Sequence, residues 1–363
     1  MPSGAPAAVR VHYAGALAAP CGSHVPLQAA SRATAVSFVQ AAAAASLRSA
    51  DPATLQTLSG QTMGTTWSVR LVNAAFAPLA PVRSAIEAAL ATVVAQMSHW
   101  EPGSDLSRFN RAAPGTRHRL APEFFTVLQA ACAWAQASGG ALDPTIGPLV
   151  DAWGFGAHGT PHVPDAAQRR AAAALVGFGR LELDAATRSA LQPGGVGLNL
   201  SGIAKGFAVD HVHRCLQALG FADVLVEVGG ELRASGARPG GAPWRVAVAD
   251  PADGPPRALA LADSAIATSG DRWHAFEHAD RRYAHTLDPR TGEPVRHGLA
   301  SVTVLHADCM QADALATVIT VLGPHEGMAF AERHGLAALV CERTARGPVW
   351  AATAAFRAQV PWA

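Results

Sequence analysis

The chain has 363 residues, of which 50% are apolar and 15% are charged, with a formal net charge of +1. This length suffices for one large domain or two ordinary ones. The composition excludes a protein that is mainly a disordered acidic or basic tail. The 28 Lys and Arg residues are balanced by 27 Asp and Glu residues. No broad positive field is available to follow a phosphate backbone, so we expect no nucleic-acid partner.

The first 58 residues are assigned to an N-terminal tail, either disordered or a poor export signal. The apolar run at 11–21 is short, and Pro20 precedes Cys21 where a lipoprotein signal has a small residue. A second, Ala-rich stretch at 34–50 suits a helix or a poor export signal. No strongly apolar stretch reaches about 18 residues, so no membrane-spanning helix is predicted. Membrane association is expected only if this N-terminus is an anchor.

Residues 59–363 are predicted to form one organised domain. Apolar periodicity predicts helices at 81–99, 122–138, 165–176 and 203–219, and in the second half of 299–323. Strands are predicted in 60–72, 195–200, 223–236, 244–251, 264–271, 283–295 and the first half of 299–323, with a closing hairpin at 336–343 and 348–356. Segments 223–236 and 244–251 are expected to be neighbouring strands. Strands grouped by hairpin-length links favour an α+β fold over a doubly wound sheet.

The five cysteines form no C-x-x-C pair. We expect scattered, mostly buried thiols rather than a metal knuckle or a disulfide framework.

Asp313 and Thr317 stand at i and i+4 in the last predicted helix, which places a carboxylate and a hydroxyl on one face. Two hard oxygens suit Mg²⁺, which also takes phosphate oxygens as ligands. On this pair alone, an Asp at a helix N-terminus and a Thr bonded to its own backbone explain the pattern better.

Lys205 lies in LNLSGIAKGFAVD, where a glycine turn leads into a helix. Free backbone N–H groups and a mobile ammonium suit an anion, although a tight connection with a solvated lysine is an equal alternative. His285 precedes the turn at 288–292 and suits a general base, with turn packing as the alternative. Trp100 and the Trp153–Phe155 segment suit stacking on a planar heterocycle, or ordinary core packing.

The sequences of these segments and their order along the chain are together more specific to one family than any single segment is. GQTMGTTWSV, MSHWEPGSDLSRFN, DPTIGPLVDAWGFG, LNLSGIAKGFAVD, VEVGGELRASG, ATSGD, HTLDPRTGEPV and ADALATVITVLG together resemble the ApbE family of FAD:protein FMN transferases. The resemblance covers about 59–345. It implies an α+β fold with a core of the tunnelling-fold type and a cleft for FAD.

The resemblance also implies an activity. An Mg²⁺-dependent transferase would bind FAD, cleave its pyrophosphate, join FMN through a phosphoester bond to a Ser or Thr hydroxyl of a target protein, and release AMP. The compartment implied is the periplasm or the inner-membrane face, or the cytoplasm if the N-terminal signal is not functional.

The resemblance assigns roles to particular residues. The metal ligands would be the Asp313 carboxylate, the Thr317 hydroxyl and the Gly202 carbonyl, and His285 would help to activate the acceptor hydroxyl. Glu231 in the G-G-E motif is a weaker candidate. The residues that would contact FAD are Met63, Trp100, Ala141, Leu142, Asp143, Asn199, Lys205 and Leu287. Asn199 stands where the family usually has Asp, which keeps the hydrogen-bonding shape but removes a charge.

Three other functions remain open at this stage. They are a protein that binds FAD without transferring FMN, an Mg²⁺-dependent FAD pyrophosphatase that gives FMN and AMP, and an assembly factor for a thiamine pathway or a metal cluster. The last is disfavoured because no cysteine pattern suits an iron–sulfur cluster.

Overall fold

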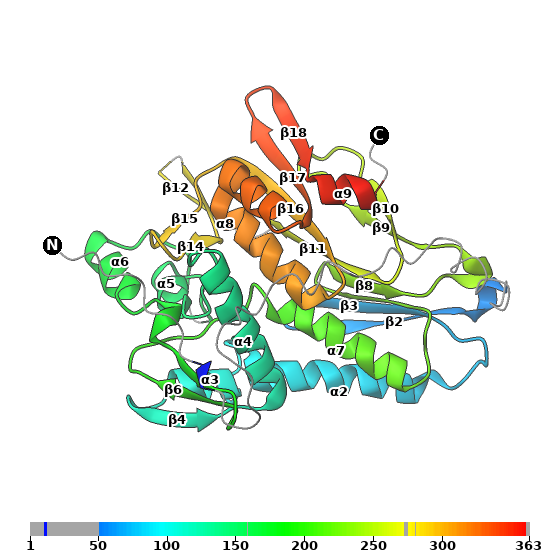
Figure 1. Ribbon diagram of the computed structural model, residues 1–363, viewed down its shortest axis with the longest axis horizontal. Helices are drawn as coiled ribbons and strands as arrows, with labels where there is room; N and C mark the ends of the chain where they lie inside the picture. Colours follow the sequence, from blue (N-terminus) through cyan, green and yellow to red (C-terminus); the bar gives the residue numbers. More distant parts are fainter. Residues whose placement is uncertain (1–10, 13–50, 158, 272–274, 280, 361–363) are drawn as a thin grey trace, which may run out of the picture.

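The computed structural model describes residues 11–12, 51–157, 159–271, 275–279 and 281–360. An eight-stranded antiparallel sheet runs through the molecule in the order β18-β17-β16-β11-β8-β7-β3-β2 (Figure 1). Its strands are β2 (Leu55–Thr62), β3 (Thr65–Val72), β7 (Val224–Val228), β8 (Glu231–Ser235), β11 (Ser264–Gly270), β16 (Leu299–His306), β17 (Ala337–Thr344) and β18 (Gly347–Ala352).

Three long helices cover one face of this sheet: α2 (Leu79–Met97), α7 (Ala204–Ala218) and α8 (Cys309–Arg333) (Figure 1). Alternation along the strands builds a core on each face, because successive side chains of a strand point to opposite sides. In β7, Val224, Val226 and Val228 join the core beneath the helices, whereas Leu225 joins the core on the other face.

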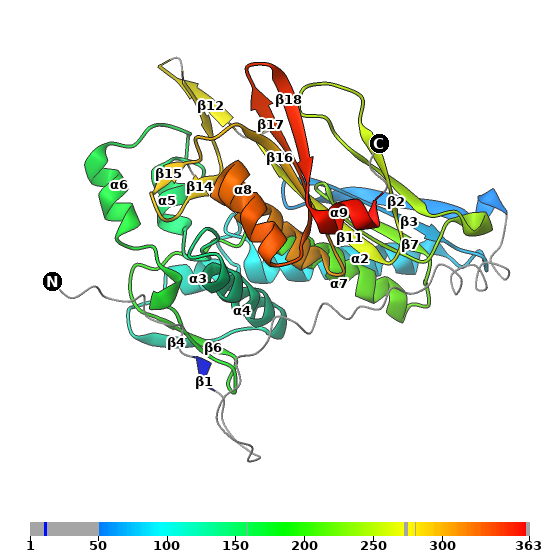
Figure 2. The ribbon, with the colours of Figure 1, turned by 45° about the horizontal axis from the view of Figure 1, so that its top comes forward.

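The other face is covered by a hairpin of β9 (Trp244–Val248) and β10 (Arg257–Leu261), labelled in Figure 1, and by α9 (Ala354–Gln359), labelled in Figure 1 and Figure 2. The prediction that 244–251 pairs with 223–236 is therefore wrong. β9 pairs with β10, and β8 pairs instead with β7 and β11. Trp244 ties the hairpin to the sheet, since its indole N–H donates to the Ser235 carbonyl at 2.9 Å.

A second group of elements packs beside one end of the sheet (Figure 1). It contains α3 (Asp105–Asn110), α4 (Pro122–Ala137), α5 (Gly147–Ala152), α6 (Ala166–Ala173), β1 (Val11–His12), β4 (Thr116–Arg119), β5 (Glu182–Asp184), β6 (Ser189–Gln192), β12 (Ala275–His278), β13 (Arg281–Ala284), β14 (Leu287–Asp288) and β15 (Glu293–Pro294). Short 3₁₀ helices span Pro52–Thr54, Phe178–Arg180 and Pro239–Gly241. Trp153 and Phe155 belong to the packing here, which confirms the core alternative for that aromatic segment.

The predicted elements match the structure well but not everywhere. The sheet begins at Leu55, so β2 takes the last residues of the predicted tail, and β10 was not predicted. The segment at 195–200 contributes one isolated bridge, between Gly197 and Ile146, instead of the predicted strand. Of the rest of the predicted tail, the structure describes only β1 and residues 51–54, and Cys21 lies outside the described residues. The described cysteines are free thiols, of which Cys132, Cys309 and Cys341 are buried, as predicted.

Helix α8 runs past the predicted end at 323 and is kinked at Gly323–Pro324, where Gly323 has φ +83°. Pro324 removes a backbone donor, which accounts for a kink rather than a straight helix. Among the described residues, this helix alone is long and apolar enough to cross a membrane. Its apolar side chains pack instead against the sheet and the other helices, as in a core helix.

His213 makes the stability of this core depend on pH. The side chain is 3% exposed, and its Nε2 lies 3.0 Å from Ser235 Oγ. Burial, reinforced by the charges of Arg233 and Arg214, lowers the pKa of His213 to about 4. In the unfolded chain histidine titrates near 6.5, so between about pH 6.5 and 4 the unfolded state binds the extra proton and stability falls as pH falls.

We expect this group to account for about 3 kcal/mol of the loss. His213→Gln should therefore lose less unfolding free energy than the wild type between neutral pH and about pH 4. Urea titrations of both proteins at each pH measure the difference. Equal losses in the two proteins would contradict the assignment.

Candidate active site

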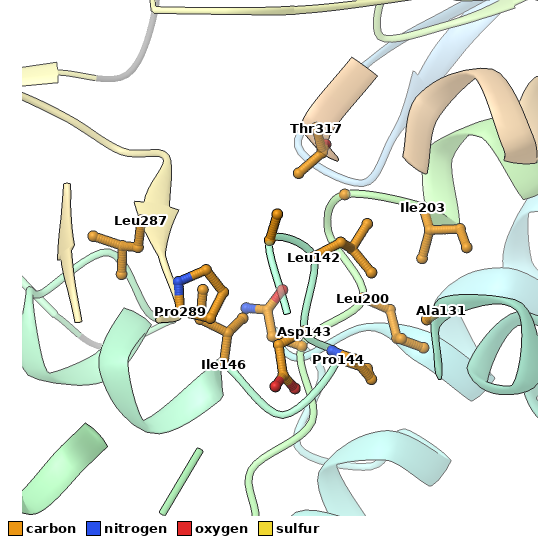
Figure 3. A pocket seen from close by; sticks show the side chains of 13 residues that line it. Ala131, Leu142, Asp143, Pro144, Ile146, Leu200, Ile203, Leu287, Pro289 and Thr317 are labelled. Carbon is orange, nitrogen blue, oxygen red and sulfur yellow. The ribbon is translucent and has the colours of Figure 1, made fainter. Parts of the chain in front are cut away.

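A small pocket of about 60 Å³ lies where α8, the start of α7 and the second group of elements meet. Seven of the twelve predicted site residues line it: Ala141, Leu142, Asp143, Asn199, Gly202, Leu287 and Thr317. Figure 3 shows Thr317 on one side of the pocket, and Leu287 with Pro289 on another. Four segments far apart in sequence thus converge on one space.

The Ala141–Asp143 wall is held in place by its own chain. Gly139 and Gly140 follow α4 with φ of +62° and +85°, which glycine tolerates, and they turn the backbone into the pocket. Asp143 Oδ1 accepts from the Thr145 N–H and hydroxyl at 2.8 and 2.6 Å, and Oδ2 accepts from the Phe178 N–H at 2.9 Å. Its carboxylate points away from Thr317 (Figure 3), so this side chain fixes the loop while the backbone lines the pocket.

Burial raises the pKa of Asp143, and its hydrogen bonds to Thr145 and Phe178 partly offset that effect. A carboxylate that accepts three hydrogen bonds from a loop acts as a rigid anchor. The apolar part of the lining was not predicted from sequence. It comprises Ala131, Pro144, Ile146, Leu200, Ile203 and Pro289. Most of these residues flank predicted lining residues in the sequence.

Asn199 also serves the shape of the backbone. Its Oδ1 accepts from the Ser201 N–H at 2.9 Å, and its own N–H donates to the Pro144 carbonyl at 2.8 Å. The first bond forms an Asx turn, which bends the chain toward α7. An Asn makes this bond as well as an Asp does, so the uncharged residue keeps the turn.

Gly202 and Thr317 approach each other across the pocket. A Cβ placed on Gly202 would lie 3.0 Å from Thr317 Oγ1 and 3.2 Å from its Cγ2. A side chain at position 202 would fill the space between the hydroxyl and the Gly202 backbone. The absence of a side chain at position 202 therefore keeps the Thr317 hydroxyl next to the Gly202 backbone.

Asp313 stands one helical turn before Thr317 and is 5% exposed. Its Oδ2 accepts from the Gly206 N–H in the first turn of α7 at 2.9 Å. Burial raises the pKa of Asp313, while the charge of Lys205 and the bond from Gly206 pull it down. The carboxylate is costly to bury and is only partly compensated, which is the condition that a bound cation relieves.

A brace from α7 sets the start of α8. Asp308 at the N-cap makes no side-chain cap bond. Asp210 of α7 takes that role, because its Oδ1 and Oδ2 accept from the Cys309 and Met310 N–H groups at 3.0 and 2.9 Å. A carboxylate there also favours the helix dipole. The position of Asp313 follows from this contact between the two helices.

Lys205 and Glu231 form an ion pair beside Asp313. Lys205 Nζ donates to Glu231 Oε1, and the Lys205 and Glu231 side chains are 35% and 3% exposed. Burial alone would lower the pKa of Lys205, but the charges of Asp313 and Glu231 raise it overall. Burial raises the pKa of Glu231 to about 7, with Lys205 opposing and Asp313 adding to the rise. Glu231 pairs with this ammonium, and the charge of Asp313 also acts on it.

The remaining predicted residues lie outside the pocket lining. Met63 and Gly64 form the two-residue turn between β2 and β3, with φ of +49° and +70°. A methionine in this left-handed region is strained, and such strain is frequent at ligand sites. His285 precedes the pocket residue Leu287 by two positions. Trp100, in the loop after α2, is 58% exposed, a large aromatic surface open to solvent.

Among the described residues, no cluster of three or more His, Cys, Asp or Glu side chains is arranged to hold a metal ion. The candidate donors are the Asp313 carboxylate, the Thr317 hydroxyl and the Gly202 backbone carbonyl. An all-oxygen set with few charges fits Mg²⁺, which keeps several waters, better than zinc.

Comparison with known proteins finds similar sequences and similar structures. A profile of the ApbE family matches residues 63–340. The FAD:protein FMN transferase of Haemophilus influenzae is 39% identical over 312 residues, which cover 83% of this chain and 90% of that protein. The structure of the Pseudomonas stutzeri flavinyl transferase ApbE superposes with a TM-score of 0.80 at 37% identity, covering 85% of this chain and 98% of that one. For the Vibrio cholerae flavin transferase ApbE, the TM-score is 0.78 at 35% identity, with 84% and 99% covered.

Proposed function

The chain belongs to the ApbE family, and from that premise we propose that it is an Mg²⁺-dependent FAD:protein FMN transferase. In this reaction the diphosphate of bound FAD is cleaved, FMN is joined by a phosphoester bond to a Ser or Thr hydroxyl of a target protein, and AMP is released. One observation carries the proposal: Gly202 and Thr317 line one pocket with apolar walls, Asp313 stands one helical turn before Thr317, and Lys205 lies in the first turn of α7, just after Gly202.

The residues present fit a magnesium ion. The Asp313 carboxylate, the Thr317 hydroxyl and the Gly202 carbonyl would hold it, and a side chain at position 202 would obstruct the gap between them. When bound, the ion would neutralise charge that develops on the diphosphate.

The chain's own residues account for the rest of the chemistry. The Lys205 ammonium, at the start of α7, attracts the diphosphate, and the helix N-terminus favours the same negative charge. The apolar walls exclude water from the reacting bond, which favours transfer over hydrolysis. His285 accepts the proton of the acceptor hydroxyl as its oxygen bonds to the FMN phosphorus. The bond from that phosphorus to the AMP oxygen breaks, and AMP leaves with the electron pair.

The test is incubation of the protein with FAD, Mg²⁺ and a target subunit that carries an acceptor Ser or Thr. A fluorescent target band that survives denaturation supports the transferase. Free FMN with no labelled band identifies a pyrophosphatase instead. Retained FAD with neither product identifies a binding protein.

Replacement of His285 tests the role of the base. We expect His285→Ala to lower the transfer rate about 100-fold, the usual contribution of a positioned base, while FAD affinity stays within about twofold of the wild type. Single-turnover labelling measures the rate, and FAD fluorescence measures the affinity. If the rate is unchanged, His285 has no part in the mechanism.

A further inference from the structure

Lys205 is the only lysine in the chain, since the other 27 of its 28 basic residues are arginines. Every other Lys or Arg position in the sequence is therefore an arginine. A lysine ammonium is a compact point charge with three donors, whereas a guanidinium is wide, planar and forked. The roles proposed above for the metal ligands and for His285 do not explain why this ammonium pairs with Glu231.

Glu231 is held in a fixed place by the strands around it. It is the first residue of β8 and follows the Gly229–Gly230 turn, where the Gly229 N–H donates to the Thr66 carbonyl at 3.0 Å. Its side chain is 3% exposed. Oε1 accepts from Lys205, while Oε2 is buried and has no hydrogen-bond partner among the described residues. A buried carboxylate with one oxygen unpaired is costly, so a structural role alone explains it poorly.

The titratable groups around Lys205 come from two elements. Asp313 and the Cys309 thiol face it from α8, and Glu231 faces it from β8. Asp313 also bonds to Gly206, the residue that follows Lys205. A divalent ion bound to Asp313 would take up the charge of that carboxylate. Glu231, on β8, is not among the proposed ligands and would then be the remaining negative group beside the lysine.

We propose that Glu231 is a positioning residue that anchors the Lys205 ammonium in the site and remains its counter-ion once a cation engages Asp313. This inference rests on the proposed function in one respect, which is that Lys205 contacts the FAD diphosphate. Without Glu231, and with Asp313 engaged by a cation, burial would favour the neutral amine, and the side chain would lose the anchor that directs it.

A single lysine makes the test direct. Protein grown with lysine labelled at Cε and Nζ gives one lysine NMR resonance, which reports the charge of Lys205 as pH is raised, with and without Mg²⁺. In the wild type we expect the resonance to stay that of a charged lysine after Mg²⁺ is added. In Glu231→Gln the amine should lose its proton at a distinctly lower pH, because an adjoining opposite charge is gone.

The matched control is Glu227→Gln. Glu227 lies in the same hairpin and bonds to the Gly230 N–H and to Ser68, but it does not contact Lys205. The Glu227→Gln substitution removes the same charge as Glu231→Gln, and we expect the titration of Lys205 to be unchanged in it. Glu231→Asp, which keeps the charge on a shorter side chain, should restore part of the wild-type titration and serves if the Gln variant does not fold.

Activity gives an independent readout. In Glu231→Gln, the alkaline limb of kcat/KM for FAD should move to lower pH, and FAD affinity without Mg²⁺ should fall about tenfold, as for loss of a positioned charge. The proposal is wrong if Lys205 titrates alike in Glu231→Gln and the wild type, or if Mg²⁺ discharges Lys205 in the wild type. The NMR titration needs no turnover, so it can succeed even if FMN transfer is not observed.

Discussion

Replacing Asp313 with Asn should lower Mg²⁺-dependent FMN transfer by about 100-fold or more while leaving the fold intact. The loss follows because an amide oxygen binds a divalent cation far less strongly than a carboxylate, and the ion is expected to stabilise the charge of the reacting diphosphate. Asp313→Ala should have the same effect on transfer. Single-turnover labelling of a target subunit at increasing Mg²⁺ measures it.

Stability should change in the opposite sense from activity. Asp313 is buried and its pKa is raised by that burial, so a neutral Asn relieves a desolvation cost when no cation is present. Lys205 keeps Glu231 as its partner. We therefore expect the melting temperature without metal to be equal to or above that of the wild type, and the increase on adding Mg²⁺ to vanish.

Asp308→Asn is the matched control, because it makes the same chemical change at the N-cap of the same helix. The Asp308 side chain is 53% exposed and pairs only with Arg233, at 3.2 Å, among the described residues. Transfer by this variant should equal that of the wild type. An Asp313→Asn protein that labels its target at the wild-type rate in Mg²⁺ would remove Asp313 from the metal site.

Features set by local sequence were predicted correctly. The i, i+4 spacing of Asp313 and Thr317 needs only a helix, and the glycine turn before Lys205 needs only a loop and a helix start. The family resemblance then collected residues that periodicity could not connect. Seven of them do line one pocket, while the contacts with FAD and with a metal ion, and the role of His285, stay predictions.

Features set by tertiary contact were not predictable in this way. β9 alternates Trp244, Val246 and Val248 inward as a strand of the main sheet would, and periodicity does not say which sheet a strand joins. Lys205 and Glu231 are 26 residues apart in the sequence. They meet only because α7 packs against β8 in the folded protein. The Asp143–Thr145 bond, by contrast, is a local Asx pattern that the D-P-T sequence could have revealed.

Gly206 is the residue whose importance the sequence conceals most. It lies in the first turn of α7, where glycine weakens a helix by about 1 kcal/mol relative to alanine. From the sequence alone, Gly206→Ala would be expected to stabilise the protein. In the structure a Cβ on Gly206 would lie 2.3 Å from the Cys309 carbonyl oxygen and 2.8 Å from Asp313 Cβ. Since both neighbours belong to the braced start of α8, neither can move without displacing the helix.

Gly206→Ala should therefore lower the free energy of unfolding by about 2–4 kcal/mol. Overpacking costs about 1–3 kcal/mol and the weakened bond to a buried carboxylate about 1.5–3 kcal/mol, against the gain of about 1 kcal/mol in helix propensity. Separating α7 from α8 also moves Asp313 relative to Gly202, so transfer should fall about 100-fold. Urea unfolding and single-turnover labelling measure the two effects.

Gly103→Ala is the control, because it adds the same methyl group where nothing lies within 4 Å. It should change neither the free energy of unfolding nor the transfer rate. A Gly206→Ala protein as stable as the wild type would mean that α8 yields, and that its contact with α7 does not fix the position of Asp313.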